Sequence, residues 1–181
     1  MKPTVAFCAA FLVVTLMGTS IALSASAADL QRDARQALAN LTSGNEAARL
    51  LNGKAKAVLV FPHMLKAGFL FGGQIGEGVL FKGGRPAGYY NSVAASYGLQ
   101  AGGQVFGYAL FFMNAGALAY LDESDGWEIG VGPSVVLVDQ GMGKSLTSTT
   151  LTQDVYAFIF DQKGLMAGVG IQGSKITRID K

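Results

Sequence analysis

The stretch that most constrains the fold of this chain is residues 89–102, where side-chain character alternates with a period of two. One set of alternate positions holds Tyr89, Val93, Ala95, Tyr97, Leu99 and Ala101, and the other holds Tyr90, Ser92, Ala94, Ser96, Gly98, Gln100 and Gly102. A period of two puts the two sets on opposite faces of a β-strand, whereas a helix groups positions three and four apart. A lone strand leaves its backbone hydrogen bonds unmade, so this stretch predicts a sheet.

The chain from residue 56 onward contains further strand signals. Residues 58–61 are predicted to form a short buried strand that Pro62 ends, and residues 127–137 alternate like residues 89–102. Residues 155–160 and 165–179 are predicted to pair as a terminal hairpin about the turn Asp161-Gln162-Lys163-Gly164. With 25 glycines in 181 residues and only 14% charged residues, the composition indicates a glycine-rich β protein and argues against disorder.

Helix signals are confined to residues 29–52. Asp29 is a candidate N-cap for a basic amphipathic helix over residues 29–41. The apolar positions of this helix recur at three-to-four spacing and are Leu30, Ala34, Ala37, Leu38 and Leu41. A second short helix over residues 46–52 is predicted to end at Gly53. The expected fold is therefore α+β, an antiparallel sheet closed into a barrel-like or sandwich core with short N-terminal α-helices.

The N-terminus is predicted to be a secretory signal peptide covering residues 1–27, which leaves a single mature domain of residues 28–181. A positive start is followed by an apolar run over residues 5–17 and by the small residues Ala25-Ser26-Ala27. A membrane anchor would need about 20 apolar residues, and polar residues interrupt this stretch after Met17. The chain is therefore expected in the periplasm or cell envelope. Lipidation of Cys8, the only cysteine, is disfavoured by the residues that precede it.

Residues 86–121 contain no charged side chain, so a membrane helix over residues 93–113 is an alternative to a strand. Asn91, Ser96, Gln100 and Gln104 and the period of two disfavour that helix. Gly68, Gly72 and Gly76 have the spacing of a glycine zipper, but glycines also suit a strand that another backbone approaches closely.

The charge distribution is polarised although the net charge is small. Of the 14 lysines and arginines only Lys2 lies in the predicted leader, so 13 basic residues remain against 12 acidic ones. This balance predicts no bulk attraction to nucleic acid or to an anionic membrane. Eight basic residues lie between Arg32 and Arg85 against three acidic ones, whereas residues 122–161 hold seven acidic residues and one lysine. An anion-binding surface and two solvated faces are both compatible with this distribution.

No catalytic, cofactor or metal site is predicted. Gly143-Lys144-Ser145 resembles the end of a P-loop, but Val138 stands where the first glycine belongs. His63 is the sole histidine and has no cysteine or second histidine with which to bind a metal. Because no acid–base pair or nucleophile context stands out, the chain is not expected to be an enzyme.

Several short blocks in order resemble the SYLF domain family. The first blocks are Ala55-Lys56-Ala57-Val58-Leu59-Val60-Phe61-Pro62, Lys66-Ala67-Gly68-Phe69 and the glycine-rich segment 72–80. The later blocks are Gly132-Pro133, Val155-Tyr156, Gly164-Leu165-Met166-Ala167-Gly168-Val169 and Gly173-Ser174. The resemblance extends over residues 30–179. It implies a lipid-binding protein whose basic amphipathic N-terminal helix contributes to membrane contact.

The resemblance and the charge distribution together predict a peripheral module that binds an anionic phospholipid or membrane surface. The residues expected to contact lipid head groups are Arg32, Arg35, Lys54, Lys56 and Lys66. Actin binding, known for some eukaryotic members of the family, is not expected of an exported chain. The alternative is a structural outer-membrane or periplasmic envelope protein without specific lipid recognition.

Overall fold

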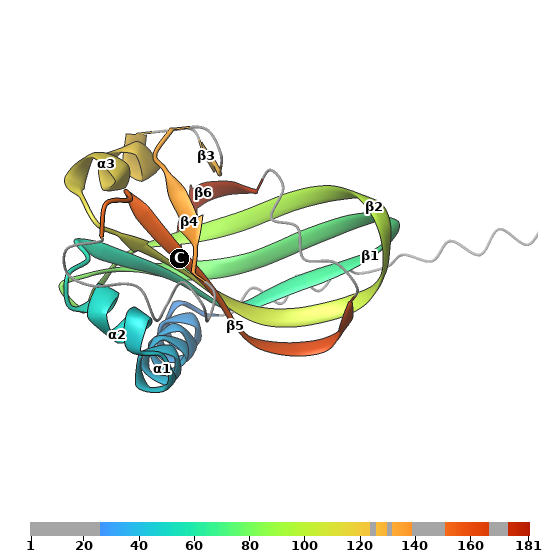
Figure 1. Cartoon of the computed structure of the whole chain (residues 1–181), viewed down its shortest axis with the longest axis horizontal. Coiled ribbons are helices and arrows are strands. Elements are labelled where there is room, and N and C mark those ends of the chain that lie inside the picture. The colour runs from blue at the N-terminus through green and yellow to red at the C-terminus, as the bar shows by residue number, and fades with distance from the viewer. Residues whose placement is uncertain (1–25, 124–125, 130–131, 139–150, 167–173) are drawn as a thin grey trace, which may run out of the picture.

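The structure is a computed structural model of the chain, and it describes residues 26–123, 126–129, 132–138, 151–166 and 174–181. The helices are α1 (Ala27–Gly44), α2 (Glu46–Asn52) and α3 (Ala115–Glu123). The strands are β1 (Ala57–Lys82), β2 (Arg85–Phe112), β3 (Trp127–Glu128), β4 (Val135–Leu137), β5 (Val155–Met166) and β6 (Lys175–Ile179). These elements form a curled half-barrel sheet with helices at one end, which confirms the predicted α+β class with a barrel-like core (Figure 1).

The sheet is built on one long hairpin. β1 pairs with β2 in antiparallel fashion from Lys82↔Arg85 at the turn to Ala57↔Phe112 at the far ends of the two strands. The other edge of β2 is shared, because β6 pairs with residues 89–93 and β5 pairs with residues 102–112. β3 extends the sheet from β6, and β4 extends it from β5 as a parallel neighbour. The alternating segment 89–102 therefore lies in β2, and the membrane helix considered for residues 93–113 is wrong.

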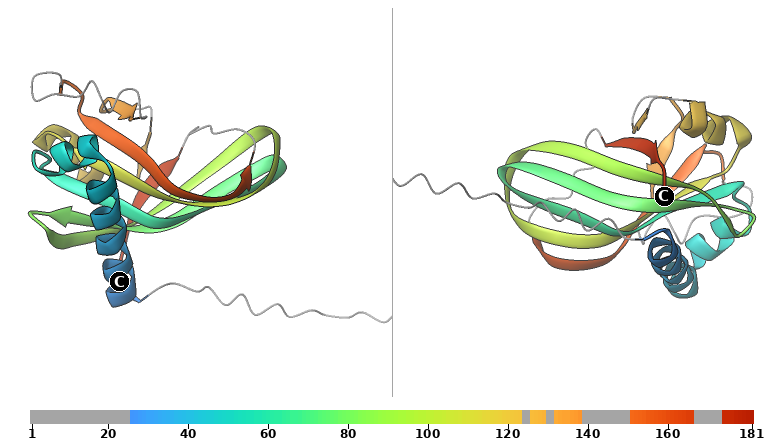
Figure 2. Two further views of the ribbon diagram at one scale, coloured as in Figure 1. Left: turned by 60° about the horizontal axis from the view of Figure 1, so that its bottom comes forward. Right: turned by 180° about the vertical axis from the view of Figure 1, so that it is seen from behind.

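Both strands of the hairpin curl back near their middle, so that the two halves of β1 lie side by side (Figures 1 and 2). A Cβ atom on Gly76 would lie 3.0 Å from the carbonyl oxygen of His63, and one on Gly78 would lie 2.8 Å from that of Val60. Real Cβ atoms rarely come so close to backbone, so only glycine permits this spacing. The predicted close backbone approach is confirmed at Gly76.

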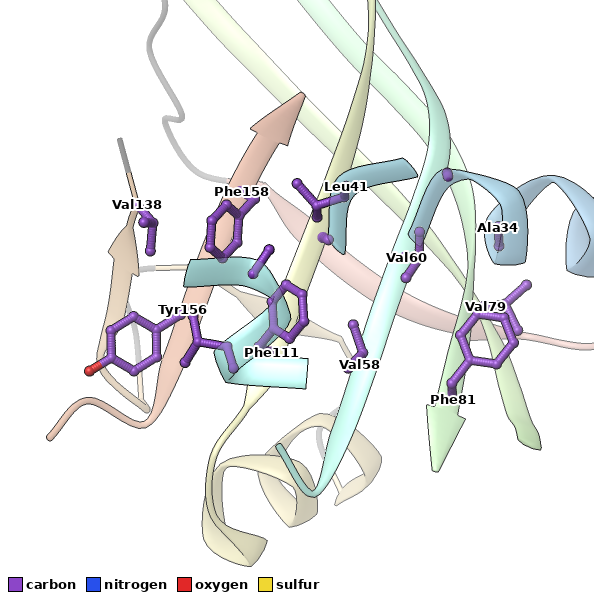
Figure 3. Close-up of a cluster of buried hydrophobic side chains, with 14 of the residues drawn as sticks. Ala34, Leu41, Val58, Val60, Val79, Phe81, Phe111, Val138, Tyr156 and Phe158 are labelled. Carbon is purple, nitrogen blue, oxygen red and sulfur yellow. The ribbon is translucent and has the colours of Figure 1, made fainter. Parts of the chain in front are cut away.

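The helices α1 and α2 cover one face of the sheet, here called the helix face. Leu30, Ala34, Ala37 and Leu41 are the buried residues of α1 and match the predicted apolar stripe. They pack with side chains of β1, β2 and β5 in one buried cluster that includes Val60, Val79, Phe81, Phe111 and Phe158 (Figure 3). α2 begins and ends where predicted, with Asn45 as N-cap and Gly53 as C-cap.

A second buried cluster lies on the opposite face of the sheet. It joins β1 and β2 side chains such as Phe61, Leu80 and Tyr108 to Trp127 and to Leu121 of α3. Helix α3 corrects the prediction that helices are confined to residues 29–52. Its only N-terminal signal is Asn114, whose Oδ1 accepts a hydrogen bond of 2.8 Å from the Ala117 N–H.

The predicted strand end at Pro62 and the predicted turn at residues 161–164 are both wrong, because each position is a bulge within a continuous strand. β1 continues through Pro62, and its register with β2 shifts between Phe61 and Met64. A bulge leaves one residue without a ladder partner, which is where a residue lacking an N–H fits. β5 likewise continues through the predicted turn 161–164, with positive φ at Asp161 (52°) and Gly164 (106°). β6 consequently pairs with β2 and β3 and forms no hairpin with β5.

The start of α1 also differs from the prediction. Ser26, and not Asp29, is the N-cap, and its side chain accepts a hydrogen bond from the Asp29 N–H. Among the described helices none combines the length and the apolar character that crossing a bilayer requires.

Candidate anion-binding groove

A groove of about 560 Å³ opens on the helix face between α1, the segment that links α2 to β1, and the β1–β2 turn. α1 contributes Arg35, Leu38 and Thr42, and the opposite wall is formed by Lys56, Val58 and Phe81. This volume is within the range of small-molecule sites. None of the described residues that line the groove is acidic, so its two cations face no opposing charge from the walls.

Arg35 is held at the groove by the turn of the long hairpin. Its Nη1 donates a hydrogen bond of 3.0 Å to the carbonyl oxygen of Gly84. Its guanidinium carbon lies 5.1 Å from the centroid of the Phe81 ring, which is a cation–π contact. Gly83 and Gly84 both have positive φ, at 55° and 74°, which is the two-residue turn that glycine best adopts. The turn therefore positions the guanidinium through backbone and ring contacts and leaves part of it exposed.

Lys56 lies at the opposite wall, just before the first residue of β1. Its N–H donates a hydrogen bond of 2.8 Å to the carbonyl oxygen of Phe112, which fixes its backbone at the end of the sheet. Its side chain is exposed. Lys54 is also exposed and stands between Gly53 and Ala55, two residues that line the groove. Arg35 and Lys56 therefore lie on opposite walls of one opening, and Lys54 lies beside it in the chain.

Arg32 is close to the groove in sequence but is engaged elsewhere. Its guanidinium forms ion pairs of 2.6 Å with Asp29 and 3.1 Å with Asp33, on the exposed side of α1. The hydrogen bond to Asp29 is the main reason that the pKa of Arg32 is raised. Two neighbouring carboxylates offset its charge, so Arg32 is a weaker attractor of anions than Lys56.

Lys66 is not part of the groove. Only 5% of its surface is exposed, and it lies in β1 opposite Gln104, about ten residues along the strand from Lys56. The bulge at Pro62 shifts the alternation of β1 by one residue, which places Met64 on the same face of the sheet as Phe61. Lys66, two residues further along, lies on that face and is buried. The structure thus separates Lys66 from the cations with which the sequence grouped it.

Sequence reasoning missed the glycine turn and Phe81 as parts of this site. The pair Gly83-Gly84 between two strand-like segments is a recognisable turn signal. What the sequence does not contain is the position of α1, which brings Arg35 across 49 residues to Gly84.

The groove suits an anionic group attached to something apolar. Arg35 and Lys56 provide donors for phosphate or carboxylate oxygens, and Leu38, Val58 and Phe81 provide apolar wall. Acid–base or metal chemistry is not indicated, because its described lining has no carboxylate, histidine or cysteine. Within the described residues no group of three or more metal-ligating side chains is close enough to hold an ion.

The apolar face of α1 is not available for insertion into a bilayer while the helix is docked. Leu30, Ala34 and Leu41 are each at most 6% exposed and pack on the sheet. The membrane contact that the family resemblance implies for this helix must therefore involve its polar side or its margins.

A family model described as "Ysc84: Las17-binding protein actin regulator" matches residues 93–181, from within β2 to the C-terminus. The chain is a SYLF-family protein. This confirms the family that the sequence blocks predicted. The SYLF family is associated with lipid and actin binding and is not a known enzyme family. No curated protein matches the chain. The matched stretch does not include Arg35, Lys54 or Lys56, so the groove is identified from the structure alone.

Proposed function

We propose that this SYLF protein is a non-enzymatic, peripheral phospholipid-binding module of the bacterial cell envelope, and that the groove between α1 and the β1–β2 turn binds an anionic head group. The observation that supports this most directly is the juxtaposition of Arg35 and Lys56 in one open, acid-free groove with apolar walls. The association of the family with lipid binding supports the same conclusion.

The chemistry of the groove favours a phospholipid over a small soluble anion. The Arg35 guanidinium offers paired N–H donors to a phosphate, and the half-buried Leu38 at the same opening offers apolar surface to glycerol and the first acyl carbons. Each cation near an anionic membrane contributes about 1 kcal/mol, so two or three cations give weak, salt-sensitive binding. Such binding fits a peripheral protein.

The protein is proposed to reach this membrane by export. The leader-like residues 1–27 support removal of the first 27 residues and a periplasmic or envelope location. Intact-mass measurement of protein recovered from the periplasmic fraction should give a chain that begins at Ala28. A chain of full mass that stays in the inner membrane would instead support a membrane anchor.

The head-group site is tested by co-sedimentation of the protein with vesicles, at low and high salt. Vesicles of phosphatidylcholine alone should bind little, and vesicles that contain phosphatidylglycerol should bind the protein at low salt and release most of it at high salt. Lys56→Glu should weaken binding to the anionic vesicles by about tenfold. Arg49→Glu is the matched control, because it reverses one exposed charge on α2 outside the groove lining.

Two results would contradict the proposal. If neither vesicle type binds the protein, the alternative of an envelope protein without lipid recognition is favoured. If Lys56→Glu and Arg49→Glu weaken binding equally, the attraction is a property of net charge and not of the groove.

A further inference from the structure

Four apolar side chains remain exposed on the helix face of the hairpin, beyond the part that α1 covers. Leu65 and Ile75 of β1 are each 51% exposed, and Val93 and Val105 of β2 are 47% and 39% exposed. Leu137, on β4 at the other end of the molecule, is the remaining large apolar side chain that is exposed among the described residues. An exposed apolar side chain alone needs no explanation, but a group of them does.

The strand register places the four residues in one row. Leu65 pairs with Val105, and Ile75 pairs with Val93, in the ladder between β1 and β2. Between the two halves of β1, Gly76 lies against Met64, which puts Ile75 level with Leu65. The row therefore runs Val105, Leu65, Ile75, Val93 across four adjacent lengths of strand, and we call it the apolar row.

The apolar row and the groove open on the same face of the sheet, on opposite sides of α1. A shallow cleft next to the row is lined by Val105 together with Gln36 and Asn40 of α1. The groove is lined by Arg35 and Leu38 of the same helix. Figures 1 and 2 show that the curled middle of the hairpin extends past α1 and α2, which leaves this part of the face uncovered by either helix.

The composition around the row identifies a bilayer as its occupant. No charged residue occurs in residues 67–76 of β1 or in residues 92–103 of β2, which pair with each other along the curled middle of the hairpin. Lys163 and Lys175 stand opposite the two end residues Val105 and Val93, where long side chains can reach lipid head groups. The exposed area of the row is on the order of 300 Å², well below the roughly 800 Å² per partner of a standard protein interface.

We propose that the apolar row enters the outer part of the lipid bilayer when the protein binds a membrane. This proposal rests on the proposed function and adds a second, hydrophobic component to it. Because apolar burial does not depend on ionic strength as ion pairing does, the row should contribute binding that high salt leaves intact. Asp161 lines the same cleft as Lys163 and offsets its charge, so most of the salt-sensitive component is assigned to the groove.

The test places an environment-sensitive fluorophore on the row. In a Cys8→Ser background, Ile75→Cys provides the only thiol and is labelled in the protein as recovered from cells. Ala115→Cys is the matched control, since Ala115 is exposed on α3, which packs on the opposite face of the sheet. Vesicles of phosphatidylcholine with phosphatidylglycerol should shift the emission at position 75 to shorter wavelength and permit quenching by a lipid-borne quencher. Emission at position 115 should not change.

A pair of substitutions tests the energetics independently of the label. Leu65→Gln combined with Ile75→Gln should weaken binding to these vesicles by about tenfold, because two half-exposed side chains lose their transfer to lipid. Leu137→Gln should leave binding unchanged. Both sites are exposed, so circular dichroism should show that each variant folds.

The outcomes separate this proposal from the proposed function. Sedimentation with vesicles while the fluorophore at position 75 stays in water overturns insertion of the row and leaves the head-group site standing. Absence of sedimentation overturns both. A shift at position 75 that occurs without vesicles and grows with protein concentration overturns insertion in favour of contact with a second copy of the chain.

Discussion

The guanidinium carbon of Arg35 lies 5.1 Å from the centroid of the Phe81 ring, so the principal cation of the groove also braces the turn of the hairpin. The hydrogen bond from Arg35 to Gly84 acts at the same place. Arg35 is therefore expected to contribute both to vesicle binding and to the free energy of unfolding, and a variant at this position changes both quantities.

Arg35→Lys should separate the two roles. A lysine keeps the positive charge but lacks the planar guanidinium that lies over Phe81 and donates to Gly84. We expect vesicle binding within about threefold of the wild type and a loss of about 1 kcal/mol in the free energy of unfolding. Urea denaturation and co-sedimentation measure the two quantities.

Arg35→Gln serves as the control because it removes the charge as well. It should lower stability by a similar amount and also reduce binding to anionic vesicles. If Arg35→Lys binds as weakly as Arg35→Gln, charge is not what Arg35 contributes to binding.

Arg32→Glu should weaken vesicle binding less than Lys56→Glu, although both reverse one positive charge. Arg32 is already paired with Asp29 at 2.6 Å and Asp33 at 3.1 Å, and it does not line the groove. We expect less than about a threefold loss of binding for Arg32→Glu against about tenfold for Lys56→Glu. Equal losses in co-sedimentation would show that the exposed side of α1 contacts the membrane.

Gly78→Ala should destabilise the protein, whereas Gly73→Ala should not. A Cβ atom at Gly78 would lie 2.6 Å from the Phe61 ring and 2.8 Å from the Val60 carbonyl oxygen. At Gly73 the nearest neighbour of such an atom among the described residues is the Ala94 carbonyl oxygen, at 3.9 Å. Overpacking of this kind costs about 1–3 kcal/mol, which thermal or urea denaturation would detect. Equal stability of the two variants would mean that the halves of β1 can move apart freely.

The sequence predicted the local elements well wherever periodicity alone decides them. The apolar stripe of α1, the bounds of α2 and the strand at residues 89–102 follow from spacing of three to four or of two. The bulges at Pro62 and Asp161 were predicted to be strand ends, because proline and a polar, glycine-containing segment are ordinary signs of a turn. Only the pairing of β1 and β5 with β2 distinguishes a bulge from a turn.

The candidate site was only partly predictable, because strand pairing and helix packing decide which of the cations lie together. Arg35 and Lys56 line one groove because α1 packs on the sheet beside the link between α2 and β1, whereas the sequence grouped them, with Lys54, from charge and the family resemblance alone. Lys66 was grouped with them because sequence distance alone does not show the one-residue shift at Pro62 that buries it. Leu65, the neighbour of Lys66, is exposed on the helix face by that same shift.

Asp122 should make the stability of the protein depend on acidic pH. It accepts hydrogen bonds of 2.8 Å from the Tyr90 hydroxyl and 3.2 Å from Lys82, and Arg178 lies 3.6 Å away, so it ties the end of α3 to β1, β2 and β6. Burial raises the pKa of this carboxyl, but the hydrogen bonds from Tyr90 and Lys82 together with the charge of Lys82 outweigh burial and lower it. A carboxyl with a lowered pKa in the folded state stabilises the protein above the pKa of the unfolded chain and loses that effect as pH falls through the folded value.

We therefore expect Asp122→Asn to lower the free energy of unfolding by about 1 kcal/mol at pH 7, since the site is partly solvent-screened. The difference from wild type should shrink as the pH falls below about 4, where Asp122 of the wild type is increasingly protonated. Tyr90→Phe removes one donor and should reduce the pH dependence in the same direction without removing the charge. Urea denaturation between pH 3 and pH 7 measures all three proteins. A constant difference between wild type and Asp122→Asn over that range would show that the carboxylate acts through packing and not through its charge.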